Sequence, residues 1–455
     1  LDAMRLPRSA PRPLLGLAAV GLIGAILATI AVASQNRDAA IRRGADPRQA
    51  SSAPTLAPAL PPRTGGDISA FQGMGTWIDI YDSSWSSPSA AVAGMASRGV
   101  RTLYLETSNF NRPSPFVYPT RTERFVDAAH DYGMDVVAWY LPGFADTERD
   151  FRMSMAAIGF RTARGDGFDA FGLDIESPEV QDPALRSARM VELSARLRDA
   201  AGDYPLGAII ASPRAMERNP DYWPGFPYAN VAGLYDVFLP MTYYSWRVSG
   251  LEGARSYTSR NIAIIRREVG TDQVPIHVIG GIADGSDDEE TRGFVQAVRE
   301  YGIIGASFYT YPLTAASEWP ILQRIPANPV QTPVLPASFG APEMGNIPGG
   351  DTTHPHEVTY RTGGKPGLRD LRFDAFDVQA AELQIYMNWE LLGTVAPGPA
   401  TAWTGARTLA VPPSVLRTDG QNVITFVASG EAPTWGVRGV SLVTHEGPSP
   451  TPAPS

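Results

Sequence analysis

Short apolar runs alternate with longer amphipathic segments between residues 75 and 325. Eight such runs, rich in aliphatic and aromatic residues, start 25 to 39 residues apart. Each has the length and composition of a buried β-strand. The eight predicted strands are 77–81, 102–105, 136–139, 171–175, 206–210, 237–241, 276–279 and 306–309.

The segments between these runs have the spacing of amphipathic helices. Eight strand-then-helix units over roughly 250 residues predict an α/β fold, a (β/α)₈ or TIM barrel. The rival is an open doubly wound sheet, which has a glycine-rich phosphate loop after its first strand; residues 81–87 read Tyr-Asp-Ser-Ser-Trp-Ser-Ser instead. Five predicted helices are followed by glycine, the residue preferred where a helix ends in the left-handed conformation. These helices are 87–97, 122–132, 183–201, 256–269 and 287–301, with Gly99, Gly133, Gly202, Gly270 and Gly302 behind them.

The remainder of the chain has an all-β pattern. Runs at 382–387 and 390–395 flank Asn388-Trp389, a predicted hairpin turn, and further strands are expected at 422–427 and 435–443. We therefore expect a β-sandwich after the barrel. It resembles the small jelly-roll modules appended to secreted carbohydrate-active enzymes, so it is a candidate carbohydrate-binding domain. The predicted boundaries are 34–66 for a Pro/Ala-rich linker, 67–325 for the barrel, 326–355 for a second linker, 356–446 for the sandwich and 447–455 for a disordered tail.

The N-terminal residues have the composition of an export signal. Three arginines precede an uncharged apolar run at 13–33, which is long enough to span a bilayer. The run ends in Ala31-Val32-Ala33, a small-x-small cleavage pattern. Residues 1–33 are therefore expected to be either a signal peptide or a signal anchor. Both alternatives predict a protein outside the cytoplasm, secreted or held at the membrane through this segment if it is uncleaved.

The charge and the residue counts argue against several kinds of partner and site. The formal net charge is −9 and no long basic run lies outside the N-terminus, so nucleic acid is not the expected partner. The absence of cysteine excludes disulfides and thiolate metal sites. With only five histidines in 455 residues, a His-rich catalytic metal site is not expected either. We predict no cofactor and no metal.

The clearest chemical signal is the segment 167–176, Gly-Phe-Asp-Ala-Phe-Gly-Leu-Asp-Ile-Glu. Strand side chains alternate in direction, so Asp174 and Glu176 point the same way at the carboxyl end of the fourth predicted strand. In TIM barrels that end holds the active site. Two close carboxylates raise one another's pKa, which suits the division between a protonated acid and an ionised partner in glycosidic cleavage. The structural alternative is a cluster of ion pairs with arginine side chains.

The other strand ends add acids and aromatic side chains. Aromatic rings stack on the C–H faces of sugars, and carboxylates hydrogen-bond their hydroxyl groups. The structural alternative is that these acids only make hydrogen bonds at the barrel mouth and that the aromatic residues pack the core or rim. Trp223 lies in the Pro-rich segment 212–234, which we interpret as a loop on the active face. The candidate substrate-binding residues are Asp79, Glu106, Trp139, Trp223, Tyr244, Trp246 and Tyr309.

The same segment resembles the fourth-strand signature of family 18 chitinases, Asp-x-x-Asp-x-Asp-x-Glu. Asp169, Asp174 and Glu176 match it, whereas Gly172 stands where the middle aspartate belongs. Pro240-Met-Thr-Tyr-Tyr244 is similar to the family's Met-x-Tyr-Asp, with Tyr244 in place of the aspartate. The shorter Asp-x-Glu also resembles the family 25 lysozymes, which cleave the glycan of peptidoglycan.

This resemblance implies a role for each matching residue. Glu176 would be the proton donor, Asp174 would orient the N-acetyl group that acts as internal nucleophile, and Tyr243 would bind that acetamido group. The expected function is a glycoside hydrolase acting on an extracytoplasmic polysaccharide that contains N-acetylhexosamine. Two alternatives stay open: a catalytically inactive sugar-binding protein, and a scaffold that presents the barrel at the cell surface.

Overall fold

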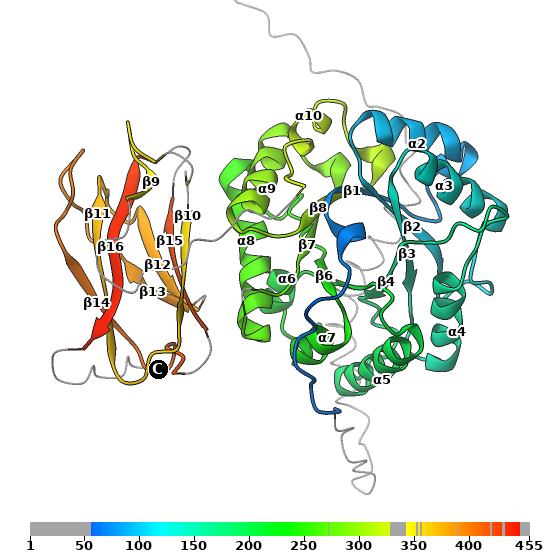
Figure 1. Ribbon diagram of the computed structural model, residues 1–455, viewed down its shortest axis with the longest axis horizontal. Helices are drawn as coiled ribbons and strands as arrows, with labels where there is room; N and C mark the ends of the chain where they lie inside the picture. The colour runs from blue at the N-terminus through cyan, green and yellow to red at the C-terminus, as the bar shows by residue number, and fades with distance from the viewer. Residues whose placement is uncertain are drawn as a thin grey trace, which may run out of the picture.

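The computed structural model describes residues 56–271, 273–327, 343–351, 354, 357–388, 390–418, 421–429 and 433–445. It consists of a barrel with a smaller all-β domain beside it (Figure 1). The predicted leader at 1–33 and the predicted tail at 447–455 lie outside the described residues. Within the described ranges, no helix combines the length and the apolar character needed to cross a membrane.

Eight parallel strands form the barrel, which confirms the predicted fold. Strands that follow one another in the chain pair side by side, and β1 also pairs with β8. Isolated bridges from Phe238 to Ile276 and from Met241 to Ile279 join β6 to β7 and complete the ring. The strands are β1 (Gly73–Ile78), β2 (Thr102–Asn109), β3 (Asp135–Leu141), β4 (Ala170–Ile175), β5 (Leu206–Ile210), β6 (Val237–Pro240), β7 (His277–Gly281) and β8 (Gly305–Tyr309).

Helices surround this ring, and all five predicted helices are present. The glycines expected behind them all have positive φ, from 57° at Gly302 to 84° at Gly270. The segment 212–234 was predicted to be a loop, but it contains two short helices. Ser212 caps the first of them by accepting a hydrogen bond from Ala215 N. The helices are α2 (Pro88–Ser97), α3 (Pro119–Asp131), α4 (Thr147–Ile158), α5 (Pro183–Ala201), α6 (Pro213–Arg218), α7 (Tyr228–Leu234), α8 (Gly250–Val269), α9 (Asp288–Glu300) and α10 (Trp319–Leu322), with short 3₁₀ turns η1 (Ser69–Phe71), η2 (Ser83–Ser86), η3 (Ala283–Gly285) and η4 (Tyr311–Leu313).

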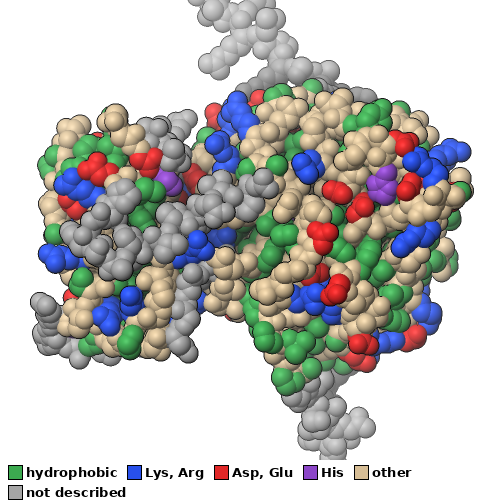
Figure 2. Space-filling view, in the orientation of Figure 1, with side chains coloured by type: hydrophobic (Ala, Val, Ile, Leu, Met, Phe, Trp, Pro, Cys, Tyr) green, Lys and Arg blue, Asp and Glu red, His purple; other side chains and the backbone are tan. Residues whose placement is uncertain are grey.

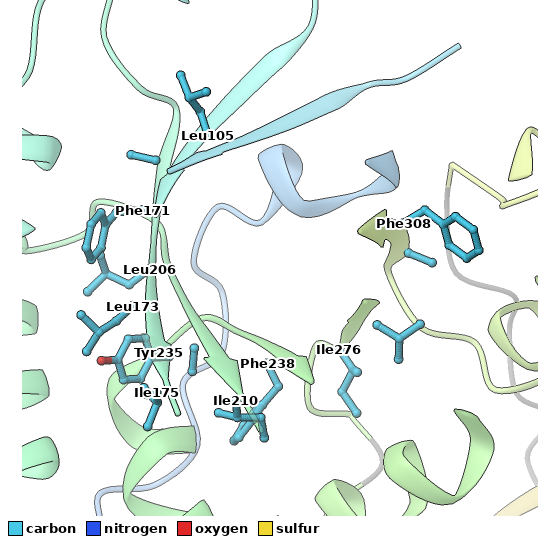
Figure 3. Packing of buried hydrophobic residues seen from close by; sticks show 14 of the residues in the cluster. Leu105, Phe171, Leu173, Ile175, Leu206, Ile210, Tyr235, Phe238, Ile276 and Phe308 are labelled. Atoms are coloured by element: carbon cyan, nitrogen blue, oxygen red, sulfur yellow. The ribbon is translucent and has the colours of Figure 1, made fainter. Parts of the chain in front are cut away.

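The two faces of each strand contribute to different cores. On β4, Phe171, Leu173 and Ile175 point outward into the apolar layer between strands and helices (Figure 3). Ala170 belongs to the separate cluster inside the barrel, and side chains alternate along the strand. Asp174, and Glu176 beyond the strand end, therefore follow the inward-facing series. The fold thus directs both acids toward the barrel axis.

The amino end of the barrel is closed by the residues that precede β1. Phe71 in η1 is fully buried inside the ring. The end of the segment predicted as a linker also packs there: Asn230 Nδ2 donates to Ala57 O at 2.8 Å, and Arg63 Nε donates to Asp236 Oδ1 at 2.9 Å. Residues 57–63 therefore belong to the barrel.

The C-terminal domain is the predicted β-sandwich, with a core that includes Trp435, Phe426 and Phe373. Asn388, at φ 48°, forms the predicted hairpin turn between β12 and β13. The predicted linker 326–355 is too long, because β9 lies within it and pairs with β16. One sheet has the order β10–β15–β12–β13 and the other β14–β11–β16–β9. The strands are β9 (Met344–Asn346), β10 (Glu357–Gly363), β11 (Arg369–Phe376), β12 (Leu383–Met387), β13 (Glu390–Thr394), β14 (Arg407–Val411), β15 (Gln421–Ala428) and β16 (Trp435–Thr444).

The sandwich lies against the barrel on the side of α8 (Figure 1). Arg417 Nη1 donates to Gly270 O at 2.7 Å, and an ion pair at 3.5 Å joins Arg267 to Glu390. Lys or Arg side chains are visible where the two domains meet (Figure 2). Polar contacts therefore hold the two domains side by side.

Candidate active site

A cleft of about 490 Å³ opens at the carboxyl ends of the barrel strands. Its volume lies within the range of about 300–1,000 Å³ that is usual for small-ligand sites. Eight of the ten sequence-predicted site residues line it, contributed by six of the eight strands or the segments that follow them. These eight are Asp79, Glu106, Trp139, Asp174, Glu176, Tyr243, Trp246 and Tyr309.

Asp174 is a buried acid of the cleft with an oxygen that faces no donor in the described part of the chain. The residue is 5% exposed, and within the described residues its Oδ1 atom has no hydrogen-bond partner. Burial raises the pKa of Asp174 well above its ordinary value, and the nearby charges of Glu176 and Glu106 raise it further. A buried carboxyl oxygen without a partner is costly. It is therefore available to a ligand.

Glu176 lies at the mouth of β4, where a neighbouring segment holds its backbone. The hydroxyl of Tyr222 donates to the carbonyl oxygen of Glu176, and Glu176 N donates to Asp174 O at 3.2 Å. Burial raises the pKa of the Glu176 carboxyl to about 7. At neutral pH this group therefore exists in both protonation states, as a general acid and base requires.

Asp79 and Glu106 form a second carboxyl pair, tied to the first turn after β1. Asp79 Oδ1 accepts from Tyr81 N at 2.7 Å, and its Oδ2 accepts from the hydroxyl of Tyr309 at 2.9 Å. Glu106 Oε2 accepts from Ile80 N at 2.9 Å. Burial raises the pKa of Asp79 and raises that of Glu106 to about 8. Both acids therefore accept hydrogen bonds, whereas Asp174 Oδ1 accepts none from the described part of the chain.

None of the four cleft acids has an ion pair among the residues that the structure describes. The arginine-paired cluster considered as the structural alternative is therefore not what the geometry shows. Nor do the described ranges contain any group of three or more His, Cys, Asp or Glu side chains arranged to hold a metal ion. The cleft acids therefore interact with hydrogen-bond donors and with one another, and they face the cleft.

Aromatic rings form the floor and wall around these acids. Trp77 stacks on Tyr104, with ring centres 4.2 Å apart, and meets Trp139 edge-on at 5.7 Å. The rings of Tyr243 and Tyr309 are 5.8 Å apart on the other side. Trp139 Nε1 has no hydrogen-bond partner within the described residues. The aromatic frame thus leaves one buried donor, in addition to the acceptor on Asp174, for a ligand.

The rim of the cleft has a different character. Trp246 is 65% exposed, at φ 61°, and Tyr81 is 40% exposed. Two exposed arginines, Arg218 and Arg247, also line the cleft. The site therefore combines an acidic, aromatic floor with aromatic and cationic groups at its mouth.

Comparison with known proteins finds only distant structural likenesses. Neither a model of a protein family nor a curated protein matches the chain. Among solved structures, the spore cortex-lytic enzyme of Bacillus cereus is 10% identical, with a TM-score of 0.42, over 56% of this chain and 74% of that one. A chitinase of Chromobacterium violaceum is 13% identical, with a TM-score of 0.41, over 56% and 98%. Active domain 2 of a Pyrococcus furiosus chitinase is 16% identical, with a TM-score of 0.40, over 56% and 93%. Likenesses this distant carry no argument about the chemistry of this chain.

Two predicted substrate-binding residues, Tyr244 and Trp223, do not line the cleft. Tyr244 follows Tyr243 directly, so it points to the opposite side, where its ring is fully buried against Phe294. Trp223 is buried beneath the 212–234 segment, with Arg186 over its ring at 4.1 Å. Both are packing residues. For these two residues, the alternative that the aromatic side chains pack the core or rim is the correct one.

Several lining residues were not among the predicted candidates. Trp77 could have been found, because it precedes Asp79 by two positions and so shares its inward direction. Tyr222, rather than its neighbour Trp223, lines the cleft. Arg218 and Tyr257 come from α6 and α8, and the sequence pattern gives no sign that either helix reaches the site.

The position of Gly172 has a physical cause. A Cβ atom placed there would lie 2.8 Å from Ile209 Cδ1. Gly172 pairs with Gly207 on β5, and the side chain of Ile209, two residues further along β5, reaches this position. Ile209 lines the cleft floor, so an apolar side chain occupies the space beside Gly172. Asp174 consequently has no acidic neighbour at 172 to hold a proton with it.

Proposed function

We propose that this protein is a glycoside hydrolase with Glu176 as general acid and Asp174 as its partner. The observation that carries the proposal is the geometry of this pair, a buried and a half-buried acid that line an aromatic cleft and have no ion pair within the described residues. The pKa of Glu176, raised by burial to about 7, suits proton donation near neutral pH. Structural acids at such depth are normally paired with cations.

In the proposed reaction, Glu176 gives its proton to the glycosidic oxygen as the bond to the anomeric carbon breaks. The acetamido oxygen of an N-acetylhexosamine attacks that carbon, and Asp174 Oδ1 accepts the acetamido N–H as the ring closes. Tyr243, whose ring lies beside Tyr309 at the cleft wall, donates its hydroxyl to the acetamido group. Water then opens the intermediate, and Glu176 takes back a proton from it.

The proposed substrate is a polysaccharide that contains N-acetylhexosamine. Trp77, Trp139 and Tyr309 offer ring faces and edges to the sugar. The Nε1 of Trp139, which has no partner within the described ranges, can donate to a hydroxyl or carbonyl oxygen. Trp246 provides an exposed platform at the mouth. Aromatic contacts of this kind suit sugar rings, which have apolar faces and polar edges.

We also propose that the protein acts outside the cytoplasm, secreted or bound to the membrane through residues 13–33. The support is the composition of that segment, an apolar run behind three arginines. The measurement is fractionation of cells that express the full chain, with antibody detection of the barrel. Recovery of all protein from the cytoplasm would contradict this proposal.

A second function, sugar binding without hydrolysis, is favoured by one observation. Ile209 fills the space beside Gly172, so the chain of hydrogen-bonded acids implied by the chitinase resemblance is interrupted. In that case Asp174 would hold an acetamido group in place while Glu176 transfers no proton.

The decisive test is glycan-array binding followed by product analysis on every glycan that binds. The wild-type protein is expected to release shorter oligosaccharides, while Glu176→Gln retains binding and releases none. Glu148→Gln is the matched control, since Glu148 lies exposed on α4 and loses the same charge away from the cleft. Binding with no products from the wild-type protein, after long incubation, would establish the second function instead.

A further inference from the structure

A second cavity, of about 640 Å³, lies between the barrel and the sandwich. One wall comes from α6 and α8, and the other from β12, β13 and β15. The sandwich wall presents Gln384, Tyr386, Leu391 and Thr425, among others. Its volume also lies in the usual range for ligand sites. No step of the proposed reaction uses this space.

The cavity adjoins the active-site cleft. Arg218 and Tyr257 line both spaces. The six-residue helix α6 separates them, with Arg218 in its last turn. An α-helix is only about 10 Å across. A chain that leaves the cleft over Arg218 therefore enters the second cavity directly.

Four arginines line the cavity, at 214, 218, 255 and 260, and three of them are ion-paired. Arg255 pairs with Glu252 at 2.9 Å and with Glu300 at 3.0 Å. Arg214 and Arg260 share Glu217. Arg218 has no ion pair within the described residues. Its planar guanidinium group, exposed at the junction, is suited to bind a carboxylate through two hydrogen bonds.

The sandwich wall is suited to sugar rather than to a simple anion. The ring of Tyr386 is half-buried, and its hydroxyl donates to Gln384 Oε1 at 2.8 Å. This ring and the side chain of Leu391, which is 54% exposed, offer apolar surface beside hydroxyl and amide groups. The wall is held in place by the ion pair of Arg267 with Glu390 and by the contact of Ala263 with Val423.

We propose that this cavity is a second glycan-binding site, continuous with the cleft across Arg218, and that it selects a carboxylate-bearing stretch of the polysaccharide. The inference rests on the proposed function, because it assigns the substrate of the same cleft to the class of anionic glycans. The sandwich is then a wall of the binding site and not a separate module on a tether.

The test uses the full chain carrying Glu176→Gln, so that glycans bind without being cut. Two ladders of increasing length are titrated by calorimetry. One is chitin oligomers; the other is peptidoglycan glycan strands freed of their peptides, which have the same backbone with a carboxylate on alternate sugars. Long carboxylate-bearing oligomers are expected to bind about tenfold more tightly than neutral oligomers of equal length, as one added charged hydrogen bond allows.

Two further variants locate the effect. Arg218→Gln is expected to remove this tenfold difference, and Tyr386→Ala to remove the gain in affinity with length. Arg124→Gln and Tyr132→Ala are the matched controls, because both residues are exposed at α3, away from the sandwich (Figure 1). If Tyr386→Ala unfolds the sandwich, Leu391→Glu tests the same wall and is expected to repel the anionic ladder.

Equal affinity for the two ladders at every length, or affinities that Arg218→Gln and Leu391→Glu leave unchanged, would overturn the proposal. The outcome is separable from that of the proposed function. Absence of hydrolysis by the wild-type protein would refute the enzyme and leave the binding result standing. Hydrolysis without any effect of the cavity variants would refute only the second site.

Discussion

Acidic side chains at the two ends of the barrel differ in their partners. At the amino end, Asp236 is buried and accepts from Arg63 Nε at 2.9 Å, from Arg198 Nη2 at 2.7 Å and from Leu206 N at 2.9 Å. At the carboxyl end, Asp174 is also buried and Glu176 is half-buried, yet no cation pairs with them in the described part of the chain. The amino end is filled by Phe71, and the carboxyl end is open.

Strand β4 shows the contrast within a few residues. Asp169, just before the strand, is hydrogen-bonded to His130 Nε2 at 3.0 Å and accepts from Val136 N at 2.7 Å. Asp174, at the other end of the same strand, has an oxygen with no hydrogen-bond partner among the residues that the structure describes. Two acids of one motif therefore have different roles. Asp169 links structural elements, and Asp174 is available to a ligand. Partners, rather than residue type or motif, distinguish them.

The largest effect on stability is expected at the amino end. Asp236→Ala leaves Arg198, whose side chain is 10% exposed, buried without its counter-charge. The free energy of unfolding should fall by about 3–5 kcal/mol, measured by urea denaturation. Asp203→Ala is the control, because Asp203 is fully exposed and lies 3.9 Å from Arg63; its effect should be negligible. Equal effects of the two variants would remove the contrast between the ends.

In the cleft, we expect a substitution at Glu176 to raise the free energy of unfolding, by less than Asp236→Ala lowers it. The folded pKa of Glu176, about 7, exceeds its ordinary value of 4.5, so folding favours the protonated group. That contribution is complete below pH 4.5 and is lost as the pH rises through about 7. Gln stays neutral, so Glu176→Gln should match the wild-type protein at pH 4 and exceed it by about 3 kcal/mol at pH 8.

This second prediction is checked by denaturation at both pH values, with Glu148→Gln as control. A loss of stability at pH 8 for Glu176→Gln would mean that the carboxylate has a favourable partner in the folded protein. The cleft would then resemble the amino end, and the distinction between the two ends would fail.

The smallest effect is expected at Asp169. Its hydrogen bond with His130 raises the pKa of that histidine, so the ion pair contributes below pH 6.5 and is lost as the pH rises through the raised value. The two side chains are 23% and 33% exposed. Asp169→Asn should therefore cost less than about 1 kcal/mol at pH 6 and less still at pH 9. A larger cost at pH 9 than at pH 6 would contradict this assignment.

Much of the barrel could be predicted from sequence because the strands are short apolar runs with a regular spacing. The alternation of side chains along β4 also predicted that Asp174 and Glu176 point together. The same alternation excludes Tyr244 once Tyr243 faces inward, and applying it strictly would have avoided that error. Trp223 could not be placed in this way, because it lies outside any strand and its direction depends on packing against Arg186.

Features that depend on contacts distant in sequence were not predictable. Nothing in α6 or α8 indicates that Arg218 and Tyr257 meet both cavities, because helix periodicity does not identify the neighbouring domain. The same limit applies to β9, three residues in a Pro- and Gly-rich segment, which becomes a strand only through pairing with β16. The missing acid at 172 was visible in the sequence, whereas its replacement by the side chain of Ile209 was not.

The most direct test of the central claim is to measure hydrolysis and unfolding on one preparation of Glu176→Gln at pH 7. We predict that the rate of hydrolysis falls by at least about 100-fold, as expected on removal of a general acid. The free energy of unfolding should be unchanged or raised. A large loss of stability with undiminished turnover would contradict the account, because Glu176 would then be a structural acid like Asp236.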